Sequence, residues 1–201
     1  MKIGIFGGTF DPPHLGHVKT FTAFFNLFPL DKVYVIPVCT PPHKQIHSLS
    51  SVEDRLNMTR LAFEKISNKV EVSDLEIKRQ GKSYTADTIR HFKEQGCDEI
   101  FFLCGTDMVL TLGSWYNPEY IFQNATIVYA RRENEPEITK KIQEKIEEYE
   151  LNFDAKIHFL ETQALEISST EIRNNVDKDC SEYLDSEVLE YIKRNGLYKK
   201  W

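Results

Sequence analysis

Six short apolar runs alternate along the chain with longer stretches in which apolar residues recur at helical spacing. The runs are rich in β-branched and aromatic residues and predict strands at residues 2–6, 32–38, 70–75, 99–104, 125–130 and 156–160. The stretches between them predict helices at residues 15–28, 52–67, 85–95, 118–123 and 137–149. Such alternation is typical of an α/β protein: a Rossmann-like parallel sheet with helices on both faces.

The chain of 201 residues is long enough for one α/β domain with a proper core. No internal repeat, low-complexity segment or long linker divides it. A last helix is predicted at residues 186–195, with Gly196 as its stop. We therefore predict a single domain over residues 1–201, in which residues 165–201 form a small C-terminal helical part.

The charge, the cysteines and the apolar stretches limit which ligands and partners the chain is expected to bind. The 25 basic and 31 acidic residues give a net charge of −6, which argues against general nucleic-acid binding but not against small phosphorylated ligands. The four cysteines are scattered, without the spacing of a zinc site. The chain starts directly on a strand and has no apolar stretch long enough to cross a bilayer, so we expect a cytoplasmic protein without membrane partners. Its oligomeric state stays open, a homo-oligomer included.

Residues 7–17, which follow the first predicted strand, read Gly-Gly-Thr-Phe-Asp-Pro-Pro-His-Leu-Gly-His. Without Cβ atoms, Gly7 and Gly8 permit positive φ and a close approach of phosphate to main-chain N–H groups. The two prolines suit a first helical turn, which Asp11 or Thr9 is available to cap. A helix start at this point offers unpaired N–H donors and a positive dipole end to an anion.

His14 and His17 are three residues apart, so they project from one face of the predicted helix toward the same anion. Each can donate a hydrogen bond to a phosphoryl oxygen. At these residues the chain resembles the nucleotidyltransferase superfamily with the signature His-x-x-His. The longer stretch resembles, more narrowly, the opening of the bacterial nicotinate-nucleotide adenylyltransferase family.

The loop after the second predicted strand contains Pro41-Pro42-His43-Lys44, where the prolines forbid a helix. A rigid loop at the carboxyl end of a strand can direct the Lys44 cation at phosphates, and Pro-Pro-His-Lys is similar to the substrate loop of the family. Ser51, with Asp54 one turn on, marks the next helix start. Arg55 also fits the family pattern, although alone it reads as an exposed helical arginine.

Two further segments follow predicted strands. In residues 83–88, Ser-Tyr-Thr-Ala-Asp-Thr, Ser83 or Thr85 is expected to cap a helix, and the segment resembles the one that holds the mononucleotide in the nicotinate-nucleotide branch. After the fourth strand, Gly105 permits close approach of a ligand, and Asp107 can accept from ribose hydroxyls or cap a short helix. Trp115, eight residues after Asp107, offers a flat face for a pyridine or purine ring.

The last two motifs supply cations. Arg131 and Arg132 end the fifth predicted strand, but the family usually continues with Pro-Gly where this chain has Glu-Asn, so which arginine meets phosphate stays open. Residues 167–173, Ile-Ser-Ser-Thr-Glu-Ile-Arg, predict a helix start with several hydroxyls and with Arg173 one turn in. This segment is similar to the second signature of the superfamily.

The resemblance covers nearly the whole chain and implies transfer of AMP from ATP to nicotinate mononucleotide, with Mg²⁺ held mainly by the triphosphate and water. It implies that His14, His17, Lys44 and Arg173 are catalytic. The implied ATP-binding residues are Gly7, Gly8, Thr9, Phe10, Gly105, Asp107, Ile167, Ser168, Ser169 and Thr170. The implied residues for the acceptor are Lys44, Ser83, Tyr84, Thr85, Trp115 and Arg131. No protein-held metal site is expected.

Alternative functions remain. A related adenylyltransferase could use nicotinamide mononucleotide or phosphopantetheine; the chain length and Pro-Pro-His-Lys speak against phosphopantetheine. A nucleotide-binding regulator without catalysis is a different class, which the intact histidines and Arg173 disfavour. A Rossmann dehydrogenase is disfavoured because Gly7-Gly8-Thr9 does not make Gly-x-Gly-x-x-Gly.

Overall fold

The computed structural model describes residues 1–40, 50–130, 136–162 and 167–198. Within these ranges, six parallel strands form one sheet in the order β3-β2-β1-β4-β5-β6. The strands are β1 (Lys2–Gly8), β2 (Lys32–Pro37), β3 (Val70–Val72), β4 (Glu99–Gly105), β5 (Thr126–Ala130) and β6 (Ile157–Leu160). The predicted parallel α/β sheet is confirmed.

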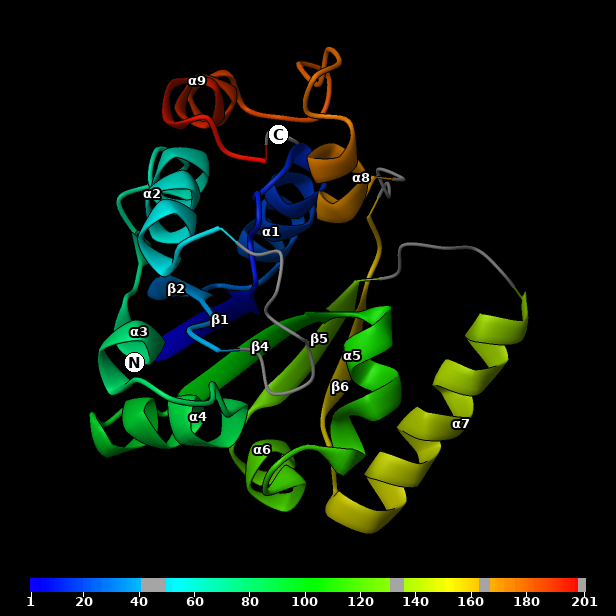
Figure 1. Ribbon diagram of the computed structural model, residues 1–201. Coiled ribbons are helices and arrows are strands. Elements are labelled where there is room, and N and C mark those ends of the chain that lie inside the picture. The colour runs from blue at the N-terminus through cyan, green and yellow to red at the C-terminus, as the bar shows by residue number, and fades with distance from the viewer. Residues whose placement is uncertain (41–49, 131–135, 163–166, 199–201) are drawn as a thin grey trace.

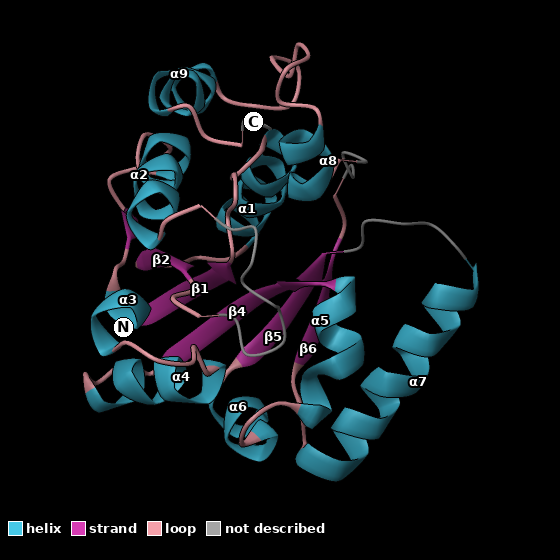
Figure 2. Ribbon diagram, viewed as in Figure 1, coloured by secondary structure: helices cyan, strands magenta, loops and turns pink. Residues whose placement is uncertain are grey.

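Helices cover both faces of the sheet (Figures 1 and 2). One face carries α1 (Leu15–Leu27), α2 (Val52–Phe63), α8 (Ser169–Asn174) and α9 (Ser186–Asn195). The other carries α4 (Thr85–Glu94), α5 (Thr106–Thr111), the 3₁₀ turn η1 (Leu112–Ser114), α6 (Pro118–Asn124) and α7 (Pro136–Phe153). No helix in the described ranges is both long enough and apolar enough to cross a membrane.

Alternation along β1 creates two separate apolar cores. Ile3 and Ile5 point into the core under α4 to α7, whereas Phe6 points into the core under α1, α2 and α9. The last helix, α9, packs in the core that contains Phe6, because its Val188 and Ile192 are buried there. The C-terminal helices therefore pack against the same sheet face as α1.

Three predicted boundaries are wrong. The strand predicted to reach residue 75 ends at Val72, and Leu75 begins the unpredicted helix α3 (Leu75–Arg79). The break comes from the polar pair before Leu75: the Ser73 hydroxyl accepts the Leu75 N–H at 3.3 Å, a local bond that competes with strand pairing. Helix α2 stops at Phe63, not residue 67, and α7 continues to Phe153, four residues beyond the predicted end at 149.

Strand β1 lies between β2 and β4, so the order of the strands reverses at β1. The chain runs outward from β1 through β2 to β3, then returns to β4 on the other side of β1 and runs outward again through β5 to β6. Ligands of open parallel sheets bind beyond the carboxyl ends of the strands at such a reversal. Here those ends are Gly8 of β1 and Gly105 of β4.

Candidate active site

The two glycines of the first motif have a different role from the one predicted. Gly7 and Gly8 are the last residues of β1, pair with Ile36 and Pro37 of β2, and are not among the residues with positive φ. The left-handed residue is Phe10, with φ 48°. A Cβ on Gly8 would lie 2.7 Å from a Phe10 ring carbon, so Gly8 is needed for packing and not for its φ angle.

Phe10 itself is a core residue. Its ring is 2% exposed and lies edge-on to Phe6 at 5.3 Å between centroids. It also meets the His17 ring at 5.3 Å, again nearly edge-on. The enclosed ring has no exposed face to offer a nucleotide.

The histidine pair forms the start of α1. His14 is the N-cap, so the predicted caps Asp11 and Thr9 are both wrong. The His14 N–H donates to Nδ1 of His17 at 3.2 Å, and the two ring centroids are 3.7 Å apart. A neutral imidazole that accepts at Nδ1 has its proton on Nε2. This bond therefore selects the His17 tautomer whose Nε2–H can donate to a phosphoryl oxygen.

Helix α8 joins the first motif to the last. Its N-cap is Ser168, in a reciprocal capping box with Glu171: the Ser168 N–H donates to Glu171 Oε2 at 2.8 Å. These bonds lower the pKa of Glu171. The Ser169 hydroxyl donates to the carbonyl of Pro12 at 2.9 Å. The start of α8 is thereby fixed against the loop that leads into α1.

Arg173 makes the second link between these segments. Its Nη1 donates to the main-chain carbonyl of Asp11 at 2.6 Å, and its Nη2 donates to the Thr170 hydroxyl at 3.1 Å. Although 157 or more positions separate the paired residues along the sequence, the structure places the two superfamily signatures side by side. Two imidazoles, a guanidinium and two helix starts at one sheet edge suit a polyphosphate.

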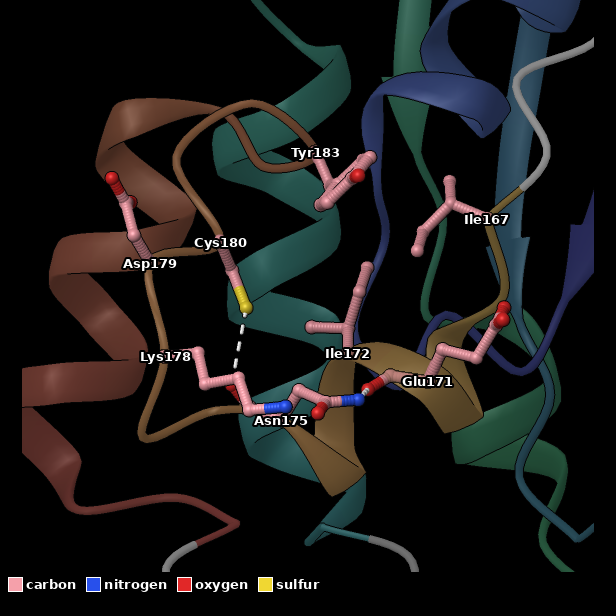
Figure 3. Close-up of a pocket in the computed structure, with 8 residues that line it drawn as sticks. All are labelled: Ile167, Glu171, Ile172, Asn175, Lys178, Asp179, Cys180 and Tyr183. Atoms are coloured by element: carbon pink, nitrogen blue, oxygen red, sulfur yellow. Dashed lines mark hydrogen bonds between the residues drawn. The ribbon is translucent and has the colours of Figure 1, made fainter.

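A pocket of about 240 Å³ lies against α8 (Figure 3). Ile167 and Ile172 line one side, and Cys180 and Tyr183 line another. The Cys180 thiol donates to the carbonyl of Asn175 at 3.4 Å. Of the predicted ATP-binding residues, only Ile167 lines this pocket, so it adjoins the junction of the two signatures without including the histidines or Arg173.

The end of β4 is open, as predicted. Gly105 is the N-cap of α5, and a Cβ placed on it would meet no atom within 4 Å. Asp107 lies exposed in the first turn of α5 and does not cap that helix. Its predicted capping role is therefore wrong, and its predicted acceptance from ribose hydroxyls stays a prediction.

The predicted acceptor segment is held to the end of β2. Tyr84, not Ser83 or Thr85, is the N-cap of α4, and it has no side-chain cap bond. The Ser83 hydroxyl is instead buried, where it accepts the Cys39 N–H at 2.9 Å. The Ser83 N–H donates to the carbonyl of Thr40 at 3.1 Å. Ser83 therefore acts on the backbone after β2 and has no exposed hydroxyl to offer.

Aromatic side chains lie near residues 83–88. Trp115 is partly buried, with its indole N–H donating to the Thr111 hydroxyl at 3.2 Å. Tyr84 and Tyr116 have ring centroids 4.6 Å apart at 36°, and Tyr116 is 54% exposed. Sequence reasoning missed Tyr116, although a tyrosine directly after the tryptophan was the available signal. Together these rings offer flat surfaces to a ligand ring.

Arg55 is buried, although from the sequence alone it reads as an exposed helical arginine. It is 1% exposed and not a surface arginine. Its Nη1 donates to the carbonyls of Thr9 at 3.0 Å and Val38 at 2.7 Å, and its Nη2 donates to the carbonyl of Cys39 at 3.1 Å. Burial lowers the pKa of Arg55, and the nearby Asp11 carboxylate opposes this shift. One buried cation thus joins the segments that follow β1 and β2.

Glu76 is a second buried charged residue that sequence reasoning missed. Its side chain is on α3 and accepts from the Thr88 hydroxyl at 2.7 Å. Burial raises the pKa of Glu76, and hydrogen bonding from Ser83 and Thr88 partly offsets the rise. Through Ser83, this carboxyl group is linked to the backbone that follows β2.

Two predicted site residues, Lys44 and Arg131, lie outside the described residues, as does Arg132. Among the described residues, no group of three or more His, Cys, Asp or Glu side chains could hold a metal ion.

The fold and the site define the class of protein: a Rossmann-like α/β protein in which the two signature motifs meet where the strand order reverses. The chain belongs to the Cytidylyltransferase-like family, which matches residues 5–175. This confirms the superfamily resemblance carried by the two signatures.

Curated relatives agree with this membership, and a solved structure shares the fold. The chain is 36% identical to a probable nicotinate-nucleotide adenylyltransferase of Clostridium tetani, over 98% of this chain and 99% of the relative. It is 38% identical to one of Desulfatibacillum aliphaticivorans, over 98% and 100%. In structure it is similar to Plasmodium falciparum nicotinic acid mononucleotide adenylyltransferase complexed with NaAD, with TM-score 0.72, 22% identity and coverage of 98% and 97%.

Replacing Arg55 with methionine should destabilise the protein by about 3 kcal/mol, because three carbonyl groups lose a charged donor inside the protein. Urea unfolding measures the change. Arg60→Met is the matched control, since Arg60 is exposed on the same helix. Equal stability losses in the two variants would contradict the role given to Arg55.

Glu76 should make stability fall as pH rises. A carboxyl group whose pKa is raised by folding binds its proton more tightly in the folded state, so its contribution is full below the unfolded pKa and is lost as pH rises through the folded pKa. The free energy of unfolding of the wild type, minus that of Glu76→Gln, should therefore decrease between the ordinary glutamate pKa and neutral pH. A difference that is constant with pH, measured by urea unfolding, would remove Glu76 as the cause.

Proposed function

We propose that this chain transfers AMP from ATP to nicotinate mononucleotide, which yields deamido-NAD and pyrophosphate. The observation that carries the proposal is the docking of α8 on the loop before α1, with hydrogen bonds from Ser169 to Pro12 and from Arg173 to Asp11. It brings the donors of both signatures to one sheet edge. The full-length relatives described above bear the name of this activity.

In the reaction, an oxygen of the mononucleotide phosphate attacks the α-phosphorus of ATP. A new P–O bond forms there, the bond from the α-phosphorus to the bridging oxygen breaks, and the electron pair leaves with pyrophosphate. The attacking phosphate is already an anion at neutral pH, so no general base is needed. The protein must supply in-line placement and stabilisation of the charge on the equatorial and leaving oxygens.

The catalytic roles fall to His14, His17, Lys44 and Arg173. His17 offers its Nε2–H, because its Nδ1 is already engaged by the His14 N–H. Arg173 is held at Asp11 with part of its side chain exposed, which leaves guanidinium donors for the triphosphate. We place Lys44 on the same phosphates from the loop after β2. Mg²⁺ arrives with ATP as part of the substrate and is held by phosphate oxygens and water.

The remaining predicted contacts divide between the two substrates. For ATP, the main chain of Gly7, Gly8, Thr9 and Phe10 supplies N–H groups, Gly105 and Asp107 face the ribose, and residues 167–170 face the triphosphate. For the acceptor, Tyr84, Thr85, Trp115 and Arg131 are the proposed contacts. Ser83 supports them through its bond with Cys39.

The other proposed properties rest on the sequence. The whole chain works as one nucleotidyltransferase domain in the cytoplasm, without nucleic-acid or membrane partners, and a homo-oligomer is compatible with it. The ligands are anions and the chain has a net charge of −6, so local donors are more important than any overall attraction.

Replacing His17 with alanine should lower kcat by about a hundredfold to a thousandfold with little loss of ATP affinity, because its donor acts on charge that develops in the transition state. Steady-state kinetics and ATP titration give the two values. His158→Ala, on an exposed position of β6, is the control. An unchanged kcat in His17→Ala would exclude His17 from catalysis.

The choice of acceptor is tested by mixing the protein with Mg-ATP and, separately, nicotinate mononucleotide, nicotinamide mononucleotide or phosphopantetheine. Pyrophosphate release should be fastest, by kcat/KM, with nicotinate mononucleotide. Preference for another acceptor would assign a related adenylyltransferase. Failure to release pyrophosphate with all three would favour the non-catalytic regulator.

A further inference from the structure

The carboxylate of Asp11 is fully buried beside the first signature. Its Oδ1 accepts from the Ser50 N–H at 3.3 Å, from the Ser50 hydroxyl and from the Tyr198 hydroxyl at 2.8 Å. Arg173 Nη1 lies 3.7 Å from its Oδ2. A buried anion needs such donors, because each unpaired charge inside a protein is costly.

Tyr198 reaches this carboxylate from the far end of the chain. After α9 the chain turns at Gly196 and comes back toward the start of α1 and α8 (Figure 1). The Tyr198 hydroxyl also lies 3.4 Å from the Ser50 hydroxyl and 3.9 Å from the Met58 sulfur. Burial and the Asp11 charge raise the pKa of Tyr198, so the phenol keeps its proton and donates it to the carboxylate.

Asp11 in turn fixes the groups assigned to the triphosphate. Its main-chain carbonyl accepts from Arg173, and the next carbonyl, that of Pro12, accepts from Ser169. His14 follows three residues after Asp11 and starts α1. The Asp11 side chain is thus anchored in the same short segment that Arg173 binds and that leads into the histidine pair.

We infer that Tyr198 is a positioning residue for the reaction: its hydroxyl holds the Asp11 carboxylate, and Asp11 holds Arg173 at the nucleotide phosphates. Tyr198 does not touch the substrate. This inference rests on the proposed function for its kinetic consequences. The contact between Tyr198, Asp11 and Arg173 stands in the protein without substrate.

The test replaces Tyr198 with phenylalanine, which keeps the ring and removes the hydroxyl. Tyr191→Phe is the matched control, because the Tyr191 hydroxyl donates to Asp54 at 2.9 Å in the nearby α2–α9 interface and has no bond with Asp11. Tyr198→Phe should lower kcat about tenfold, with KM for ATP changed less than about threefold, because a transition-state contact is misplaced. Tyr191→Phe should keep wild-type kcat.

A double-mutant cycle decides whether the effect passes through Arg173. In an Arg173→Lys background, the further loss from Tyr198→Phe should be under about twofold, because groups that act as a unit are not additive. A full tenfold loss in that background would overturn the inference. So would wild-type kcat in Tyr198→Phe, or an equal loss of kcat in Tyr191→Phe.

A readout without substrate separates this inference from the proposed function. NMR spectra of the whole protein report the chemical shift of the Arg173 Nε–H signal, which is assigned by its loss in Arg173→Lys. This chemical shift should change in Tyr198→Phe and stay unchanged in Tyr191→Phe. If it moves while no acceptor yields pyrophosphate, the proposed function fails and the positioning contact stands. If it stays in Tyr198→Phe, the inference fails whatever the activity.

Discussion

The hydrogen bonds of Arg55 hold together the segments that follow β1 and β2, and the rest of the site is assembled on those segments. Chain that leaves a strand has carbonyl groups without sheet partners, and each must find a donor when it is buried. The planar guanidinium reaches the carbonyls of Thr9, Val38 and Cys39 at once, which the single ammonium of a lysine would not match in geometry. The desolvation of this cation is offset in part by the buried Asp11 carboxylate.

Main-chain carbonyl groups hold the proposed catalytic side chains in place. Arg173 and Ser169 bind carbonyls of the loop before α1, and the His14 N–H fixes His17. The side chains proposed to meet phosphate are thus oriented by groups that themselves cannot move without breaking several buried bonds. Transfer of a phosphoryl or adenylyl group depends mostly on placement and on charge stabilisation, so a frame of this kind is what the reaction requires.

The periodicity of the chain was enough to predict the parallel sheet and the helices on both faces, because strands buried on two faces are short continuous apolar runs. It did not resolve the break after Val72, where alternation continues and a local hydroxyl bond from Ser73 ends the strand. Caps were predicted from residue type, and His14 and Tyr84 took those positions because neighbouring segments decide them. Arg55 and Glu76 were missed as buried groups, since only their partners distant in the sequence reveal why a charge lies inside.

The net charge of the chain makes short-range contacts decisive for the proposed binding of a nucleotide. A chain with a net charge of −6 repels nucleotide polyanions at long range, but screening limits that repulsion to about 8–10 Å in physiological salt. Inside that distance the described donors at the sheet edge act directly: two imidazoles, Arg173 and the N–H groups of two helix starts. Affinity on such a surface comes from short hydrogen bonds, which weaken steeply with misalignment. The proposed binding of a nucleotide therefore depends on the buried bonds of Arg55 and Asp11, although neither side chain is exposed.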